Sequence, residues 1–497
     1  MQLNRSNYAT ISHPERVIQF GEGNFLRGFV DWMIECANQK GVFDGSVVVV
    51  QPIPQGTVPL LNQQDGLYTL VSRGLVAGEP VVQQTVVTAI SRGLNAYEDW
   101  EKVLACAEDP NIDILVSNTT EAGIVYQPTD TLEQNPPMSF PGKVCAYLYR
   151  RYTKFNGDPS KGMLILPCEL IEANGDTLRE IVIKLAQQWQ LEPGFVEWVR
   201  NANIFCNTLV DRIVTGYPGK EEAARLCANL GYTDELLVTS ELFHLWVIEA
   251  PTGTSTRFPL HLADLQVKWV TDIKPYRTRK VRILNGAHTT TYALAYLAGC
   301  DYVREAAEDP MISEYMRSII FREIIPTVNM DPKELADFAN QVIERFRNPY
   351  IQHRWLDIAL NGVAKFKTRV LPSLIPYLER NLVPPLLSLA FAGLIRFYRG
   401  CLTDQGLAGS YRGREYLVRD ERTVLELLNR IWDAAGDDYA TAVKQVLAQE
   451  QLWGTDLSQY PALLKQIADY LSSIDTKGIR PTMQDALEGS RRSVDHA

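Results

Sequence analysis

The sequence predicts an α/β N-terminal domain followed by an all-α C-terminal domain. Three observations favour this division. A strand, a glycine-rich turn and a helix follow one another near the N-terminus, and short β-branched runs typical of buried strands recur up to Ile248. From Pro275 onward helical periodicity replaces them. We therefore expect domains of residues 1–272 and 273–497.

The first predicted strand, Arg16–Phe20, leads directly into the turn Gly21–Gly28 and a helix. Gly21 permits a tight turn, Gly23 lets the backbone approach a pyrophosphate, and the helix N-terminus offers free N–H groups to that anion. This arrangement is typical of a Rossmann-like dinucleotide-binding domain. The third glycine of the fingerprint should fall at Leu26, so the match is incomplete and an ordinary strand-to-helix turn remains the alternative.

A second buried strand, Val47–Val50, follows at the spacing of a βαβ unit. The next residue is Gln51, where a carboxylate usually holds a ribose hydroxyl. This position therefore leaves the choice between NAD and NADP open.

Further strands and helices complete the predicted first domain. Strands are expected at 67–72, 86–90, 112–117, 163–168 and 242–248, and helices at 97–107 and, capped by Asp176, up to about Trp189. Residues 205–213 form an apolar run. The loop Asn118–Gly123 follows a buried strand, and ligands of open α/β sheets bind at that edge. Asp211 and Arg212 form either a structural pair or part of a substrate crevice.

The second domain is expected to contain only helices. Their predicted ranges are 275–298, 301–325, 332–346, 349–369, 383–399, 421–449 and 459–473.

Composition indicates an ordinary globular protein of the cytoplasm. The chain has 497 residues, 46% hydrophobic, with a net charge of −10, which argues against a nucleic-acid partner. Its eight scattered cysteines suit free thiols, and its six histidines show no metal-ligand spacing, so we predict no metal site. No signal segment or membrane span is expected.

The predicted helix from Pro275 carries Lys280, Asn285 and His288. Asn285 and His288 share a helix face, while Lys280 lies roughly 140° from Asn285 at about 100° per residue, so its long stem must bend to reach that face. An amine can exchange a proton with a hydroxyl or carbonyl oxygen, and an amide and an imidazole can stabilise that oxygen. The alternative is a core histidine and a solvated lysine.

Three motifs in this order resemble the mannitol dehydrogenase family: Gln19–Arg27, Val210–Ile213 and Lys280-x4-Asn285-x2-His288. Further similar stretches are Ser117–Gly123, Leu166–Ile171, Leu209–Pro218, Ile283–His288 and Arg345–Ile351, and they favour the sugar-acid members. The resemblance spans nearly the whole chain. It implies NADH-dependent, metal-independent interconversion of D-tagaturonate and D-altronate in hexuronate catabolism.

The resemblance also implies roles for individual residues. Lys280 is the general acid/base, Asn285 and His288 hold the reacting oxygen and a neighbouring hydroxyl, and Asp211 lines the substrate site. The cofactor-binding residues are expected to be Phe20, Gly21, Glu22, Gly23, Asn24, Phe25, Asn118, Thr119, Thr120 and Glu121.

One departure from the family pattern concerns Pro167–Leu170, where polyol members have Ser-Cys-Asp-Asn. Leu170 stands where the polyol members have the final amide donor. That donor is therefore missing here, or another residue such as Asn174 supplies it. We interpret this as the mark of another substrate subgroup.

A sugar-acid substrate also needs a cation for its carboxylate. The candidates are Arg345, Arg347, His353, Lys365 and Arg369, each of which has solvated helix charge as its alternative. Fructuronate or a neutral polyol such as mannitol remains a substrate alternative. A non-redox NAD-binding protein or isomerase is the alternative of another class, and the oligomeric state stays open.

Overall fold

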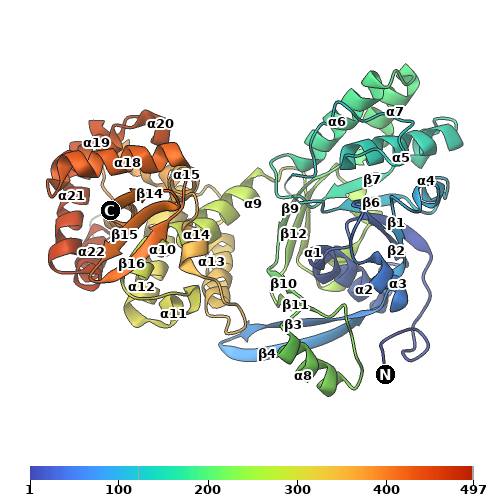
Figure 1. Cartoon of the computed structure of the whole chain (residues 1–497), viewed down its shortest axis with the longest axis horizontal. Coiled ribbons are helices and arrows are strands. Elements are labelled where there is room, and N and C mark those ends of the chain that lie inside the picture. Colours follow the sequence, from blue (N-terminus) through green and yellow to red (C-terminus); the bar gives the residue numbers. More distant parts are fainter. Residues whose placement is uncertain (121, 495–497) are drawn as a thin grey trace. The chain divides into compact units, whose positions relative to one another are not determined.

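The computed structural model describes residues 1–120 and 122–494, which form two compact units (Figure 1). The first unit comprises Met1–Gly74 and Glu79–Ile273, and the second comprises Leu75–Gly78 and Lys274–Ala497. The short segment Leu75–Gly78 is the tip of a hairpin, where the backbone N–H of Gly78 donates to the carboxylate of Glu344 at 3.1 Å.

A six-stranded parallel sheet organises the first unit. Its strands are β1 (Glu15–Phe20), β2 (Ser46–Gln51), β5 (Ile90–Asn95), β6 (Ile114–Ser117), β7 (Leu164–Pro167) and β8 (Ile204–Phe205). Their order is β5–β2–β1–β6–β7–β8, with β1 paired in parallel to both β2 and β6. The strand order reverses between β1 and β6, and ligands of such sheets bind beyond the carboxyl ends of the strands at that point.

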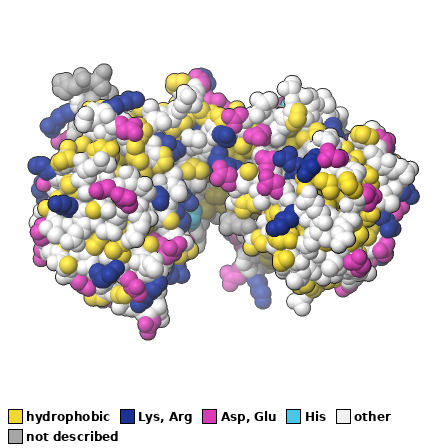
Figure 2. Space-filling view, turned by 90° about the horizontal axis from the view of Figure 1, so that it is seen from above, with side chains coloured by type: hydrophobic (Ala, Val, Ile, Leu, Met, Phe, Trp, Pro, Cys, Tyr) yellow, Lys and Arg dark blue, Asp and Glu magenta, His cyan; other side chains and the backbone are white. Residues whose placement is uncertain are grey.

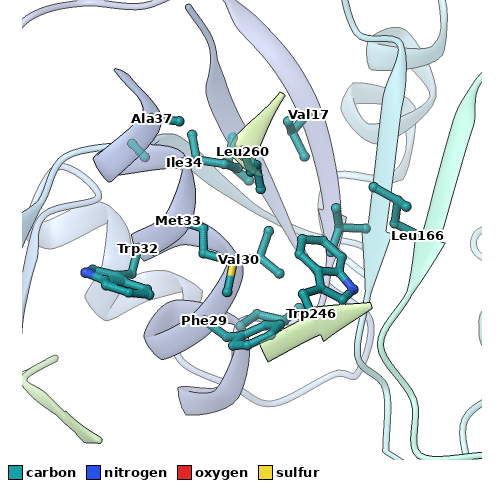
Figure 3. Packing of buried hydrophobic residues seen from close by; sticks show 14 of the residues in the cluster. Val17, Phe29, Val30, Trp32, Met33, Ile34, Ala37, Leu166, Trp246 and Leu260 are labelled. Carbon is teal, nitrogen blue, oxygen red and sulfur yellow. The ribbon is translucent and has the colours of Figure 1, made fainter. Parts of the chain in front are cut away.

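Alternating side chains of the sheet enter two separate hydrophobic cores. Val17 and Leu166 pack with α2 (Trp32–Gln39) on one face, as Figure 3 shows around Met33 and Trp246. Ile18 and its neighbours pack on the other face. The helices on that face are α4 (Trp100–Ala107), α5 (Phe140–Lys154), α6 (Asn174–Gln188) and α7 (Pro193–Ala202). The helices on both faces leave the carboxyl edge of the strands as the place for a ligand.

Two smaller sheets complete the first unit. Their orders are β10–β11–β3–β4 and β13–β12–β9. Their strands are β3 (Tyr68–Val76), β4 (Glu79–Val87), β9 (Asn207–Asp211), β10 (Val214–Gly216), β11 (Val238–Glu241), β12 (Leu245–Glu249) and β13 (Val267–Val270). Helix α3 (Val58–Gln63) lies between β2 and β3 in the chain, and helix α8 (Lys220–Leu230) lies between β10 and β11.

Three local predictions for this unit are wrong. The expected strand at 86–90 falls on the break between β4 and β5, and the short strand β13 was not anticipated. Asp176 does not cap α6, because that helix begins two residues earlier at Asn174, after Ala173 in the left-handed conformation (φ +48°). The Asp176 carboxylate instead accepts hydrogen bonds from Arg179 and Asn207.

The second unit is largely helical, as predicted. Its helices include α9 (Lys274–Arg279), α10 (Gly286–Leu297), α11 (Val303–Glu308), α12 (Pro310–Ser318), α13 (Pro332–Phe346), α14 (Trp355–Ala359), α15 (Gly362–Arg369), α16 (Leu371–Leu378), α17 (Pro385–Phe397), α18 (Arg422–Ala435), α19 (Tyr439–Leu447), α20 (Glu450–Trp453), α21 (Pro461–Thr476) and α22 (Ile479–Val494). A three-stranded antiparallel sheet, β14 (Gly400–Thr403), β15 (Gly406–Tyr411) and β16 (Arg414–Val418), adds to them. Sequence periodicity missed this sheet because its strands are short and face both core and solvent.

Several long predicted helices are divided in the structure. Pro310 begins a new helix after Asp309, Asn361 takes the left-handed conformation (φ +54°) between α14 and α15, and Gly436 (φ +57°) ends α18. Each residue interrupts an otherwise continuous apolar pattern by its backbone preference, which periodicity alone does not register.

The surface mixes charges of both signs. In the view of Figure 2, basic and acidic side chains are interspersed over the drawn face. Within the described residues, no helix is long and apolar enough to cross a membrane. The eight cysteines all lie in the described part of the chain and are free thiols.

Candidate active site

A cavity of about 560 Å³ lies at the carboxyl edge of the parallel sheet, within the range of sites for small organic ligands. Its lining includes Gly21, Glu22 and Gly23 after β1 and the loop after β6. A second cavity of about 550 Å³ shares Asn118 and Thr120 with it. The structure thus gathers most of the predicted cofactor residues at the reversal of strand order.

The two glycines of the turn have different tasks. Gly21 has φ +122°, and a Cβ there would lie 2.8 Å from the carbonyl oxygen of Asn118, so the turn demands glycine. A Cβ on Gly23 would meet nothing within 4 Å, so this backbone is open to a ligand in the cavity it lines. The helical run that follows, from Asn24 to Gln39, presents its N-terminus there.

Gly28 takes the packing role of the third fingerprint glycine, whose usual position is occupied by Leu26. A Cβ on Gly28 would lie 2.8 Å from Val214 and 3.3 Å from Val238, so the glycine allows close packing of helix and strand. It lies in a π-helical segment, Arg27–Asp31, two residues beyond the position of the third fingerprint glycine. Sequence reasoning missed this role because it assumed the standard spacing.

Two residues of the predicted cofactor set are engaged with the protein itself. The Phe20 ring is fully buried against Phe140 and Tyr147, so only its backbone faces the turn. The Asn24 side chain accepts a hydrogen bond from Arg27 at 2.7 Å. Phe25 lines the second cavity, with its ring stacked on Phe29.

Glu169, for which sequence analysis predicted no role, holds the loop after β6 in place. The Glu169 carboxylate accepts from the Thr119 backbone N–H (2.9 Å), the Thr119 hydroxyl (3.0 Å) and the Ser117 hydroxyl (3.1 Å). Burial raises the pKa of Glu169, while these hydrogen bonds oppose the rise. The predicted contact Glu121 lies outside the described residues.

Asn174 is not a substitute for the missing amide of position 170. Its buried Nδ2 donates to the carbonyl oxygens of Pro167 (2.9 Å) and Glu169 (3.1 Å), which ties α6 to the end of β7. Leu170 is 62% exposed and lines the second cavity. The hydrogen bonds of Asn174 are therefore structural, and the expectation that it donates to the substrate is wrong.

Asp211 and Arg212 differ in their surroundings. Asp211 is buried at the end of β9. Arg212 donates to the carbonyl oxygens of Gly28 (2.7 Å) and Glu241 (3.0 Å), so its guanidinium fastens the turn helix to the neighbouring sheet.

In the second unit, Lys280 and Asn285 begin and end a π-helical segment, Lys280–Asn285, between α9 and α10. A π turn closes i→i+5 hydrogen bonds, so residues five apart are related as residues four apart are in an α-helix. Lys280 and Asn285 therefore share a face without the bend that α-helical geometry required. The expected separation of roughly 140° between Lys280 and Asn285 was wrong, because it assumed an α-helix where the segment is a π turn.

His288 lies at the centre of a group of cationic side chains, which we call the cation cluster: Arg345, His353, Lys365 and Arg369. Its ring centroid is 5.2 Å from that of His353 and 4.4 Å from that of Phe346. Burial, followed by the charges of the cluster, lowers the pKa of His288 well below its ordinary value. Its Nε2 is shielded from water, and no described residue hydrogen-bonds to it. The imidazole of His288 is thus held in its neutral form.

Like charges also crowd one another within the cation cluster. Lys365 and Arg369 are four residues apart on α15, and the pKa of Lys365 is lowered by burial and then by Arg369. Burial also lowers the pKa of Arg369 and, together with Lys365, that of His353. Lys365 Nζ donates to the carbonyl of Ile358 at 2.9 Å. An anion bound here would relieve the repulsion.

The predicted clamp candidate Arg347 and two arginines next to Lys280 in the chain are engaged elsewhere. Arg347 donates to the carbonyl of Ala307 (3.3 Å) and the hydroxyl of Ser313 (3.1 Å), which removes it from the clamp candidates. Arg279 pairs with Glu334 at 3.2 Å, and Arg282 donates to Ser373 at 2.7 Å. Among the described residues, no three His, Cys, Asp or Glu side chains gather to hold a metal ion.

A parallel sheet with a glycine-turn cavity, joined in one chain to a helical unit bearing a lysine–amide–imidazole set, defines an oxidoreductase of the dinucleotide-dependent class acting on a CH–OH group. Comparison with known proteins agrees. Residues 15–261 match the mannitol dehydrogenase Rossmann domain, and residues 272–475 match the mannitol dehydrogenase C-terminal domain. The chain belongs to the mannitol dehydrogenase family.

Similar proteins extend over the whole chain. An altronate oxidoreductase of Yersinia pestis is 44% identical over 96% of this chain and 98% of its own length. The altronate oxidoreductase of Bacillus subtilis (strain 168) is 43% identical over 98% of both.

Two solved structures share the fold. Pseudomonas fluorescens mannitol 2-dehydrogenase, in a ternary complex with NAD and D-mannitol, superimposes with a TM-score of 0.69 at 22% identity, over 98% of this chain and all of that one. A substrate-free D-sorbitol dehydrogenase gives 0.79 at 23% identity, over 97% and 100%.

Proposed function

We propose that this protein is an NAD-dependent altronate oxidoreductase that interconverts D-tagaturonate and D-altronate. Two independent lines support the substrate class. Relatives about 44% identical along nearly the full chain carry this name. The cation cluster around His288 carries the proposal structurally, because crowded cations with lowered pKa values favour a carboxylate-bearing sugar over a neutral polyol.

The cofactor fits the cavity after β1. Gly21 and Gly23 give a pyrophosphate access to the backbone, and the helix N-terminus at Asn24 offers it N–H groups. We assign Phe20 (through its backbone), Gly21 to Phe25 and Asn118 to Glu121 to the cofactor. When bound, NADH supplies a hydride to the ketone carbon.

The protein's own part in the reaction is to move one proton and stabilise one oxygen. Lys280, as ammonium, protonates the oxygen that gains charge when tagaturonate is reduced, and takes that proton back in the reverse direction. Asn285 and neutral His288 hold this oxygen and a neighbouring hydroxyl. Asp211 is proposed to contact a further substrate hydroxyl.

The substrate carboxylate is assigned to the cation cluster, with Arg369 and Lys365 as its main partners. A guanidinium offers a two-pronged hydrogen bond to a carboxylate, and a lysine on the next turn adds a second charge. His353 and Arg345 contribute positive potential. Arg347, with its guanidinium engaged elsewhere, is left out of this assignment.

The direct test follows NADH oxidation at 340 nm with D-tagaturonate, D-fructuronate and D-fructose in parallel. We expect strong turnover of tagaturonate and a loss of about 10²–10⁴-fold in kcat in Lys280→Ala. Lys333→Ala, at an exposed salt bridge with Asp337, is the matched control and should leave kcat unchanged. Preference for fructuronate or fructose would overturn the substrate assignment. Binding of NADH without turnover of any of the three would overturn the enzymatic role.

We also propose that the reaction needs no metal ion, because Lys280, Asn285 and His288 supply both the proton and the stabilisation of the oxygen. Dialysis against EDTA should leave the rate unchanged. A rate lost on dialysis and restored by Zn²⁺ or Mg²⁺ would contradict this part.

A further inference from the structure

The place where Rossmann domains usually hold a carboxylate for the adenosine ribose is occupied here by an amide with other partners. The Nε2 of Gln51, the last residue of β2, donates to the carbonyl oxygens of Ile53 (2.9 Å) and Pro54 (3.3 Å). Its Oε1 accepts from the backbone N–H of Val58 at 3.2 Å. Gln51 therefore shapes the loop after β2, and its amide is committed to that loop.

A carboxylate reaches the same place from another strand. Glu22, between the two glycines after β1, is only 9% exposed, and the backbone N–H groups of Glu22 itself and of Thr57 favour its ionised form. A Cβ added to Gly56 would clash with Glu22 Oε1 and would lie 2.6 Å from the Gln51 amide carbon. Glu22 and Gln51 thus converge on Gly56, at the beginning of α3.

This carboxylate also faces the cofactor cavity. Glu22 lines it together with Pro52 and Ile53, which follow β2 directly. An ionised carboxylate has about four acceptor positions, so the two nearby backbone N–H groups leave others for ribose hydroxyls. Burial raises the pKa of Glu22, which is the cost of holding an acid at this position.

We infer that Glu22 replaces the missing carboxylate after β2: it accepts hydrogen bonds from the adenosine ribose hydroxyls and excludes a 2′-phosphate, so it selects NAD over NADP. The physical basis is that a 2′-phosphate placed against a half-desolvated carboxylate brings like charges together with little water between them. This inference rests on the proposed dinucleotide site and concerns which dinucleotide that site takes.

The test measures binding of NADH and NADPH by cofactor fluorescence, without any sugar substrate, to wild type, Glu22→Gln and Glu98→Gln. Glu22→Gln keeps the size and one acceptor but removes the charge. We expect the ratio of the Kd for NADPH to that for NADH to fall at least tenfold in Glu22→Gln. Glu98→Gln, at an exposed position of the same unit, should leave the ratio unchanged.

A second variant guards against a purely structural effect. Gly56→Ala keeps the carboxylate but displaces it, and should lower the same ratio. Equal weakening of both cofactors, or a ratio within twofold of wild type in both variants, would show that Glu22 only anchors the loop and would overturn the inference. If the wild type bound neither cofactor, the proposed function itself would fail.

Discussion

The cofactor cavity of the first unit and the cation cluster of the second are built on opposite principles. The cofactor cavity is lined by backbone and by polar and apolar side chains, and the buried acids at or beside it, Glu22 and Glu169, have raised pKa values. Around His288 lie cationic side chains, and the pKa values of His288, Lys365 and Arg369 are lowered. In both regions, burial disfavours the charged form of these side chains.

The difference shows what each region can discriminate. The glycine turn Gly21–Gly23, which we call the cradle, binds a pyrophosphate through its backbone. Its selectivity therefore depends on the absence of side-chain atoms, such as a Cβ at Gly23. The cation cluster recognises a carboxylate by charge, so its selectivity depends on which side chains are present. Substitutions in the cradle should therefore affect stability and NADH binding, whereas substitutions in the cation cluster should affect substrate binding.

The largest effect is expected from a methyl group in the cradle. Gly21→Ala forces a non-glycine residue into φ +122° against a backbone oxygen 2.8 Å away, and should destabilise the protein by about 2–3 kcal/mol as well as weaken NADH binding. Gly23→Ala meets no atom and replaces only a favourable helix N-cap residue, so it should weaken NADH binding about tenfold or more while lowering stability by about 1 kcal/mol or less.

Thermal unfolding and NADH titration of both variants check this contrast. Equal stability of the two, or normal NADH binding by Gly23→Ala, would contradict the view that the backbone itself is the binding surface.

A smaller, charge-specific effect is expected from the cluster. Arg369→Met should raise the KM for tagaturonate roughly 10–100-fold, since a charge-assisted hydrogen bond contributes about 1.5–3 kcal/mol. The Kd of NADH should not change. Arg347→Met, whose guanidinium serves Ala307 and Ser313, is the control. A rise in KM caused by the control as large as that caused by Arg369→Met would argue against a local clamp.

The smallest effect concerns pH and has opposite signs in the two regions. The folded-state pKa of His288 is lowered, so the unfolded chain binds the proton more tightly, and stability should fall as pH falls below about 6.5. The slope should reach up to about 1.4 kcal/mol per pH unit, and His288→Asn should remove its share.

Glu169 should behave in the other direction. Because its folded-state pKa is raised, its contribution is fully present below about 4.3 and is lost as pH rises through the folded pKa. Urea unfolding of wild type, His288→Asn and Glu169→Gln across pH 4–7 separates the two. If the free energy of unfolding changed with pH in the same way in all three proteins, neither His288 nor Glu169 would contribute to the pH dependence as described.

The sequence predicted the fold class and most of the cofactor cradle because these depend on local patterns. Buried strands read as β-branched runs, and Gly21 and Gly23 follow the first of them directly. It could not predict that Gly28 takes the part of the third glycine, or that Asn174 is tied to Pro167, because both depend on contacts with distant elements. The small sheet β14–β16 was missed because its strands are short and face both core and solvent.

Chain neighbours and periodicity were enough to predict a strand–turn–helix segment, a helical second unit, and a lysine, an amide and an imidazole on one segment. The face that the lysine shares follows from the π turn at Lys280–Asn285, which is a feature of the folded chain. The tertiary structure alone also brought His353, Lys365 and Arg369 to His288 from other segments and turned Arg347 away. Such choices depend on packing between residues far apart in the chain, and no local pattern records them.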